Sequence, residues 1–128
     1  MNYPIEDYYA VVDSGKLGDA VDLLAEDVEF VMVLPSGVRT GRGRAAMLEY
    51  LGGRPDVDRK HRVLRVAADG DMQFAHGAVI ENGTVTTGYF VAAMHFDAAG
   101  RIDRYQVTFN AEFPVLPGGF TPEGAQRA

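Results

Sequence analysis

The sequence predicts an α+β fold in which three N-terminal helices pack on a strongly curved antiparallel, or mixed, sheet and enclose a pocket. Two short helical segments come first, followed by a strand, a third helix and four consecutive strands. Between Asp58 and Pro114 the chain consists almost wholly of strand-like runs separated by turn residues. Asn82-Gly83 between two such runs is typical of a hairpin, because Asn and Gly tolerate positive φ. A curling sheet covered by so few helices leaves a hollow, where we expect any function to lie.

The helices are predicted from apolar spacing and from their end signals. Pro4 suits a first helical position, and the first helix should cover about residues 4–13. Its apolar stripe recurs at helical spacing in Ile5, Tyr8, Tyr9 and Val12. The second helix is expected at roughly 16–25 and the third at about 44–51, closed by Gly52-Gly53.

The strands differ in how many of their faces are apolar. Residues 28–34 (VEFVMVL) are too apolar for a strand with one wet face and predict a buried one. Several later strands also carry apolar residues on both faces, so a second copy of the chain would cover the outer face. We therefore expect a homodimer through the outer sheet face. The later strands are predicted at 61–68, 72–81, 84–96 and 101–109.

Composition limits the classes of function. A chain of 128 residues holds one domain, which we place at 1–113, with a C-terminal tail at 114–128. The net charge of -6 argues against nucleic acid, which needs clustered Lys and Arg. The densest basic stretch, Arg39–Arg44, favours solvated charge around a turn over a phosphate site. With neither a signal-peptide pattern nor an apolar run of membrane-span length, we expect a cytoplasmic protein without a membrane partner.

Neither a metal nor a cofactor is expected. Cysteine is absent, which excludes disulfides and thiolate chemistry. The three histidines lie on separate predicted strands without a His-x-His pair, which makes a poor zinc cluster. No motif for phosphate loops, dinucleotides or nucleophile elbows occurs.

Four segments carry a resemblance to a known family: residues 8–15 (YYAVVDSG), 23–28 (LLAEDV), 40–47 (TGRGRAAM) and 96–102 (FDAAGRI). Over about residues 5–112 the chain resembles the nuclear-transport-factor-2-like superfamily, in its SnoaL-like polyketide-cyclase and ketosteroid-isomerase-like branch. The resemblance implies a cone-shaped fold with an apolar cavity between a bent sheet and the helices.

The same resemblance argues against the ketosteroid isomerase mechanism. That mechanism uses a carboxylate base together with a Tyr and a protonated Asp that hold the developing enolate. Tyr8 falls on the position of the oxyanion-hole Tyr, whereas the two carboxyl positions fall on Met32 and Ala92. Neither of these side chains can move a proton, so a standard ketosteroid isomerase is not expected.

Cyclase and dehydratase relatives often use a His on the strand after the third helix, and His61 stands at the matching place. Imidazole could remove a proton beside a carbonyl or protonate a leaving hydroxyl. Tyr8 and Tyr50 could donate hydrogen bonds to the oxygen that gains charge. We therefore name His61, Tyr8 and Tyr50 as candidate catalytic residues. The alternatives are a solvent-exposed strand-end histidine and a core tyrosine.

The cavity lining is predicted from strand parity. His76 depends on the register at Asn82-Gly83: a two-residue turn places Ala75 on the face of Ala92, and a three-residue loop with a bulge places His76 there. We favour the second register. Ordinary core packing is the alternative for all lining residues. The predicted ligand-binding residues are Met32, His76, Ala92, Met94, Phe96, Tyr105, Val107 and Phe109.

Two functions remain open at this point. The first is an enzyme that acts on a small apolar carbonyl compound (polyketide-, steroid- or terpenoid-like) by cofactor-free cyclisation, dehydration or isomerisation. The second is a non-catalytic small-molecule-binding or dimeric accessory protein of the same fold. The histidine and tyrosines favour the first, and the missing carboxylates favour the second.

Overall fold

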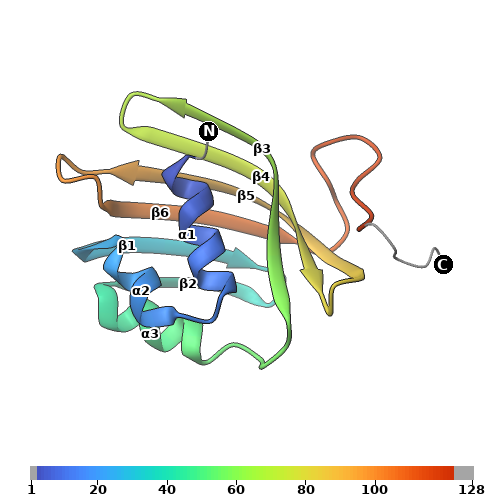
Figure 1. The fold of residues 1–128 in the computed structure, drawn as a ribbon, viewed down its shortest axis with the longest axis horizontal. Helices are drawn as coiled ribbons and strands as arrows, with labels where there is room; N and C mark the ends of the chain where they lie inside the picture. The colour runs from blue at the N-terminus through green and yellow to red at the C-terminus, as the bar shows by residue number, and fades with distance from the viewer. Residues whose placement is uncertain (1–2, 123–128) are drawn as a thin grey trace.

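The computed structural model describes residues 3–122, and these residues form the predicted α+β fold (Figure 1). The helices are α1 (Pro4–Asp13), α2 (Leu17–Asp22) and α3 (Arg44–Gly52). The strands are β1 (Leu24–Leu34), β2 (Gly37–Arg42), β3 (Arg59–Asp69), β4 (Met72–Glu81), β5 (Val85–Phe96) and β6 (Ile102–Asn110). No helix in this described range is long and apolar enough to cross a membrane.

The six strands form one curved, unclosed mixed sheet in the order β2-β1-β6-β5-β4-β3. Among the strands of residues 3–122, only β1 and β6 pair in parallel, and every other neighbouring pair is antiparallel. Figure 1 shows α1 lying across the sheet, with α2 and α3 near the β1–β2 end. Helix α1 packs on β3 and β4, whereas α3 packs on β1 and β2. The apolar core lies between this helical layer and the inner face of the sheet.

Strand β2 was not predicted, because its sequence (GVRTGR) reads as a glycine-rich turn. It pairs with β1 from Glu29↔Arg42 to Leu34↔Gly37 and forms the edge of the sheet. Most of its residues are exposed, which is why no apolar alternation marks it. Strand β1 also begins earlier than predicted, at Leu24, which pairs with Ile102.

Helix α3 is fixed to β1 by the residue that begins it. Arg44 donates from Nε and Nη2 to the Leu24 carbonyl oxygen, at 2.9 and 2.7 Å. The basic stretch 39–44 therefore divides into one structural arginine, Arg44, and two arginines on the edge strand β2, Arg39 and Arg42.

The prediction that His76 faces inward is wrong. The β4–β5 loop does contain three residues between Glu81 and Val85. A bulge then follows, since Ile80 pairs with Thr86 but Val79 pairs with Gly88. This second irregularity restores the parity of a two-residue turn, so Ala75 lies opposite Ala92 on the inner face. His76 is consequently on the outer face.

The segment after β6 returns over part of the outer face. The Phe120 backbone N–H donates to the Tyr89 hydroxyl at 3.1 Å, and Thr86 Oγ1 donates to the Phe120 carbonyl at 2.9 Å. His76 is buried here, with Nδ1 bonded to the Phe90 carbonyl oxygen at 2.9 Å. The tail predicted at 114–128 lies outside the described residues from 123 onward.

Candidate functional site

A histidine–aspartate pair joins α1 to β3. Asp13 is the last residue of α1, and its Oδ1 accepts a hydrogen bond from His61 Nδ1 at 2.7 Å. Its Oδ2 accepts a second bond from the His61 backbone N–H at 2.6 Å. The two side chains are only 10% and 4% exposed. Because the carboxylate holds the proton on Nδ1, His61 Nε2 is the ring atom left to exchange a proton.

Aromatic side chains fix the plane of the His61 ring. Tyr9 stacks on it with ring centroids 4.8 Å apart, and Phe90 meets it edge-on at 5.5 Å. Phe109 lies on a further side at 6.2 Å. Phe90 can reach this place because Gly77 pairs with it, and any side chain at that position would meet the Phe90 ring. The imidazole is therefore held by packing as well as by its carboxylate.

Three buried tyrosines lie beside this pair. The hydroxyls of Tyr9 and Tyr105 share a hydrogen bond of 2.6 Å. Tyr8 meets both rings edge-on at 5.7 Å, but its own hydroxyl has no hydrogen-bond partner within residues 3–122. Burial raises the pKa of Tyr8, so the phenol keeps its proton and remains a donor. A buried polar group without a partner lowers stability by roughly 1–3 kcal/mol. A ligand oxygen that accepts a hydrogen bond from this hydroxyl would recover that free energy.

A cavity of about 30 Å³ lies where these side chains meet. Water needs roughly 10–15 Å³, so the interior has room for little more than one or two water molecules. All three predicted catalytic residues, His61, Tyr8 and Tyr50, line it. The full lining is Tyr8, Tyr9, Val12, Met32, Tyr50, Leu51, Arg54, His61, Tyr105 and Phe109.

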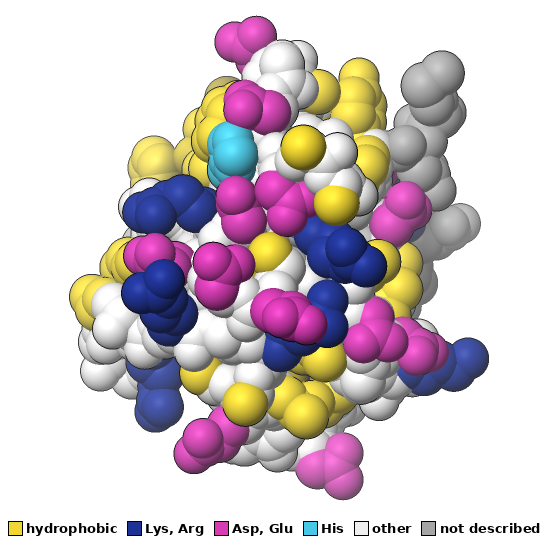
Figure 2. All heavy atoms as spheres, turned by 90° about the vertical axis from the view of Figure 1, so that its left-hand side faces the viewer, with side chains coloured by type: hydrophobic (Ala, Val, Ile, Leu, Met, Phe, Trp, Pro, Cys, Tyr) yellow, Lys and Arg dark blue, Asp and Glu magenta, His cyan; other side chains and the backbone are white. Residues whose placement is uncertain are grey.

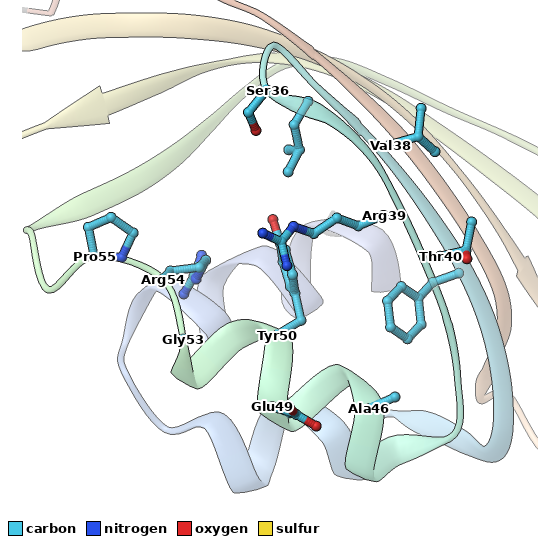
Figure 3. Close-up of a pocket in the computed structure, with 12 residues that line it drawn as sticks. Ser36, Val38, Arg39, Thr40, Ala46, Glu49, Tyr50, Gly53, Arg54 and Pro55 are labelled. Carbon is cyan, nitrogen blue, oxygen red and sulfur yellow. The ribbon is translucent and has the colours of Figure 1, made fainter.

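A larger, open pocket of about 770 Å³ adjoins this cavity between β2 and α3. Tyr50 and Arg54 line both spaces, so they stand at the boundary between them. Figure 3 shows Arg39 from β2 reaching into the pocket toward Tyr50 of α3, with Arg54 on the adjoining wall. Burial raises the pKa of Tyr50, although Arg54, Arg39 and Arg59 act in the opposite direction. We call this pocket the mouth.

The predicted lining residues divide into three groups. Met32, Tyr105 and Phe109 line the inner cavity. Phe96 packs at the margin of the core, and His76 lies on the outer face. Ala92, Met94 and Val107 are buried in the core and line none of the described pockets. A ligand-binding role for any of them stays a prediction.

Sequence reasoning missed Asp13, Tyr9 and Arg54. A signal for Asp13 was present, because Ile5, Tyr9 and Asp13 follow one another at four-residue spacing on the buried face of α1. A carboxylate on an apolar helical stripe needs a buried partner, and His61 supplies it. Arg54 carried no comparable signal, since it follows Gly52-Gly53 in what reads as a loop.

Within residues 3–122 no group of three or more His, Cys, Asp or Glu side chains could hold a metal ion. The polar groups that line the inner cavity are imidazole, phenol and guanidinium.

Solved structures and a family model agree on the fold. No curated protein matches the chain. A provisionally assigned ketosteroid isomerase from Kribbella flavida superposes with a TM-score of 0.71 at 21% identity, covering 97% of this chain and 91% of that one. An LEH-like epoxide hydrolase from M. tuberculosis gives 0.68 at 18% identity, covering 84% and 80%. A provisionally assigned polyketide cyclase from Xanthomonas campestris gives 0.67 at 23%, covering 84% and 87%.

These identities establish a common fold and leave the activity open, since one fold hosts many chemistries. The family evidence comes from the sequence itself, because the model of the SnoaL-like domain matches residues 5–105. The resemblance drawn from the sequence is thereby confirmed. The chain belongs to the SnoaL-like domain family and has the fold of the NTF2-like proteins.

Proposed function

We propose that this protein catalyses cofactor-independent proton transfer on a small apolar carbonyl compound, with His61 as acid and base. The observation that carries the proposal is the buried His61–Asp13 pair. Its imidazole lines the same cavity as Tyr8, whose hydroxyl has no partner within residues 3–122. The reacting part of a polyketide-, steroid- or terpenoid-like substrate would suit the mainly aromatic and aliphatic lining of the inner cavity. Cyclisation, dehydration and isomerisation all begin with the same proton transfer.

The proton moves between substrate carbon and His61. Asp13 holds the proton on Nδ1, so Nε2 accepts a proton from the carbon beside the carbonyl. The electron pair of the broken C–H bond moves into an enolate, whose oxygen accepts a hydrogen bond from the Tyr8 O–H. The imidazolium, stabilised by Asp13, then returns the proton to a leaving hydroxyl or to another carbon. Every proton taken up in this sequence is released, and no oxidant or reductant is required.

Met32 and Ala92 occupy the positions where ketosteroid isomerases carry their two carboxyl groups, and the proposal gives neither residue a role in proton transfer. Both residues are buried and apolar, at 3% and 2% exposure. The acid–base group therefore lies on β3 and α1 rather than at the two positions that the ketosteroid isomerases use.

The mouth would hold most of the substrate. The inner cavity of about 30 Å³ is too small for a bicyclic molecule, whereas the mouth of about 770 Å³ is not. Tyr50 and Arg54, both half-buried, separate the two spaces. The Tyr50 side chain would turn aside when the reacting edge of the substrate reaches Tyr8 and His61.

The first test is native mass spectrometry of freshly purified protein, which would detect a retained small molecule. The second uses 2-tetralone in D₂O as a probe, with NMR to follow deuterium incorporation beside the carbonyl. We expect the protein to accelerate this exchange and His61→Gln to abolish the acceleration. His95→Gln is the control, because His95 lies away from the cavity. Equal acceleration by the His61→Gln variant and the unmodified protein would contradict the proposal.

A non-catalytic binding or accessory role is the second candidate, favoured by the small volume of the inner cavity. It predicts a molecule that is retained but recovered unchanged, with no exchange of 2-tetralone above the rate in buffer.

A further inference from the structure

We propose that the ligand of the mouth is an organic acid whose carboxylate binds between Arg54 and Arg39. This inference deepens the proposed function and relies on it only for the orientation of the ligand. The carboxylate would lie in the mouth, and the apolar carbonyl-bearing part would point toward Tyr8 and His61.

Arg54 occupies the boundary between the mouth and the inner cavity. It follows Gly53, the C-cap of α3, and its Nε donates to the Leu51 carbonyl oxygen at 3.2 Å. This bond fixes one edge of the guanidinium. Within residues 3–122 the two Nη groups donate no hydrogen bond. The side chain is half-buried and lines both spaces.

The surroundings of Arg54 disfavour its own charge. Burial and the nearby Arg59 both lower the pKa of Arg54, whereas Tyr50, Tyr8 and Asp13 act in the opposite direction. Asp13 is already occupied by its two bonds to His61. A half-buried cation with a second cation beside it is stabilised when an anion arrives.

Arg39 supplies a second guanidinium from the opposite wall. It lies on β2 and projects into the mouth toward Tyr50 (Figure 3). Neither Arg39 nor Arg54 forms an ion pair in the part of the chain from residue 3 to residue 122. Glu49 is the acidic residue of the mouth, and in Figure 3 its carboxylate points away from both guanidinium groups.

Carboxylate is the ligand chemistry that fits this arrangement. A guanidinium presents paired N–H donors that match the two oxygens of a carboxylate. Each charge-assisted hydrogen bond contributes roughly 1.5–3 kcal/mol, which corresponds to about 10- to 100-fold in affinity. A neutral apolar ligand would leave both cations unpaired as it displaced water from the mouth.

The test compares 2-naphthoate with 2-naphthamide, which share size and apolar surface but differ in charge. Titrations followed by ¹H–¹⁵N NMR would give the Kd of each probe. We expect 2-naphthoate to bind about tenfold or more tightly, with the largest shifts at residues of the mouth. Arg54→Gln and Arg39→Gln should each weaken 2-naphthoate binding about tenfold and leave 2-naphthamide binding nearly unchanged.

Arg101→Gln is the matched control, because this exposed arginine lies in the β5–β6 turn. Arg39 is on an exposed edge strand, so its variant stays informative if the Arg54 variant does not fold. Equal binding of the two probes, no binding of either, or an equal loss in Arg101→Gln would overturn the carboxylate site. Those results would leave the proton-transfer proposal standing, since 2-tetralone exchange tests it separately. Absence of 2-tetralone exchange with preserved selectivity for 2-naphthoate would overturn the proton-transfer proposal and leave the carboxylate site standing.

Discussion

Asp13 and His61 are 48 residues apart in the chain, yet one carboxylate binds both the ring and the backbone of the histidine. The two bonds use different oxygens, so the position of β3 along α1 and the rotation of the imidazole are fixed together. A histidine held in this way keeps Nε2 directed at a single place.

Asp13→Asn removes the negative charge while keeping the size of the side chain. Without that charge the imidazolium is no longer stabilised, and the amide can hold the wrong tautomer. We expect the acceleration of 2-tetralone exchange to fall by about 100-fold or more. Asp7→Asn is the control, since Asp7 lies on the exposed face of the same helix. Unchanged exchange in the Asp13 variant would show that the carboxylate does not serve the proposed chemistry.

Tyr8→Phe and Tyr105→Phe should differ in stability. The Tyr8 hydroxyl has no partner within residues 3–122, so its removal should leave the free energy of unfolding unchanged or raise it by about 1 kcal/mol. The Tyr105 hydroxyl bonds Tyr9, so its removal should lower that free energy by about 1–2 kcal/mol. Urea denaturation measures both. Only the Tyr8 variant should slow exchange while keeping full stability, and a large destabilisation would argue against an unpaired hydroxyl.

Gly77→Ala should destabilise the protein by about 1–3 kcal/mol, because the added methyl would meet the Arg62 carbonyl oxygen and the Phe90 ring. The displaced Phe90 would also disturb His61, so exchange activity should fall. Gly18→Ala is a matched control in α2, where a new methyl meets nothing within 4 Å. There we expect a gain of about 0.5–1 kcal/mol. Equal melting temperatures for the two variants would contradict the close packing at Gly77.

His95 should make stability depend on pH. Its ring bonds Asp103 and, through Nε2 at 2.7 Å, Asp71, and these hydrogen bonds raise the pKa of His95 above its ordinary 6.5. A raised pKa in the folded state stabilises the protein fully below pH 6.5, and this contribution is lost as pH rises through the folded value. His95→Gln should therefore lower stability at pH 5.5 and change it little at pH 9. Figure 2 shows the side of the molecule with the β3–β4 and β5–β6 turns, where acidic and basic side chains are interspersed. Thermal melts across this range, repeated in high salt, would check the sign; a larger effect at pH 9 would contradict it.

The homodimer remains a proposal with a direct test. Phe74 and Val91 are on the outer face, and 41% and 48% of their surfaces are exposed. Light scattering after size exclusion should give twice the chain mass for the unmodified protein. Phe74→Lys should shift the protein toward monomer, whereas Val38→Lys on the edge strand should not. A monomer at all concentrations would refute the dimer.

The sequence predicted the parts of this fold that follow from apolar periodicity. The stripe of Ile5, Tyr8, Tyr9 and Val12 is buried as predicted, and the last three strands lie close to their predicted positions. Strand β2 was missed because an exposed edge strand needs no apolar residues. The face of His76 was missed because the bulge between Ile80 and Val79 leaves no mark in the sequence.

The site was predictable only in part, because local sequence patterns do not indicate how distant segments are placed relative to one another. The resemblance led to His61 and Tyr8, and both line the inner cavity. Periodicity could have led to Asp13, because a carboxylate on the apolar stripe of Ile5 and Tyr9 indicates a buried partner. The role of Arg54 could not be predicted. It depends on how the turn after α3 is placed relative to β2, and no local sequence pattern indicates that placement.

The bond between Tyr9 and Tyr105 spans 96 residues and joins α1 to β6 beside the site. A ribosome-bound chain that has not yet released β6 would therefore lack the Tyr105 wall of the inner cavity. Chemistry would appear only after β6 has been synthesised and has paired between β1 and β5. The onset of 2-tetralone exchange could thus report when the site is complete during folding, without a dye or a tag.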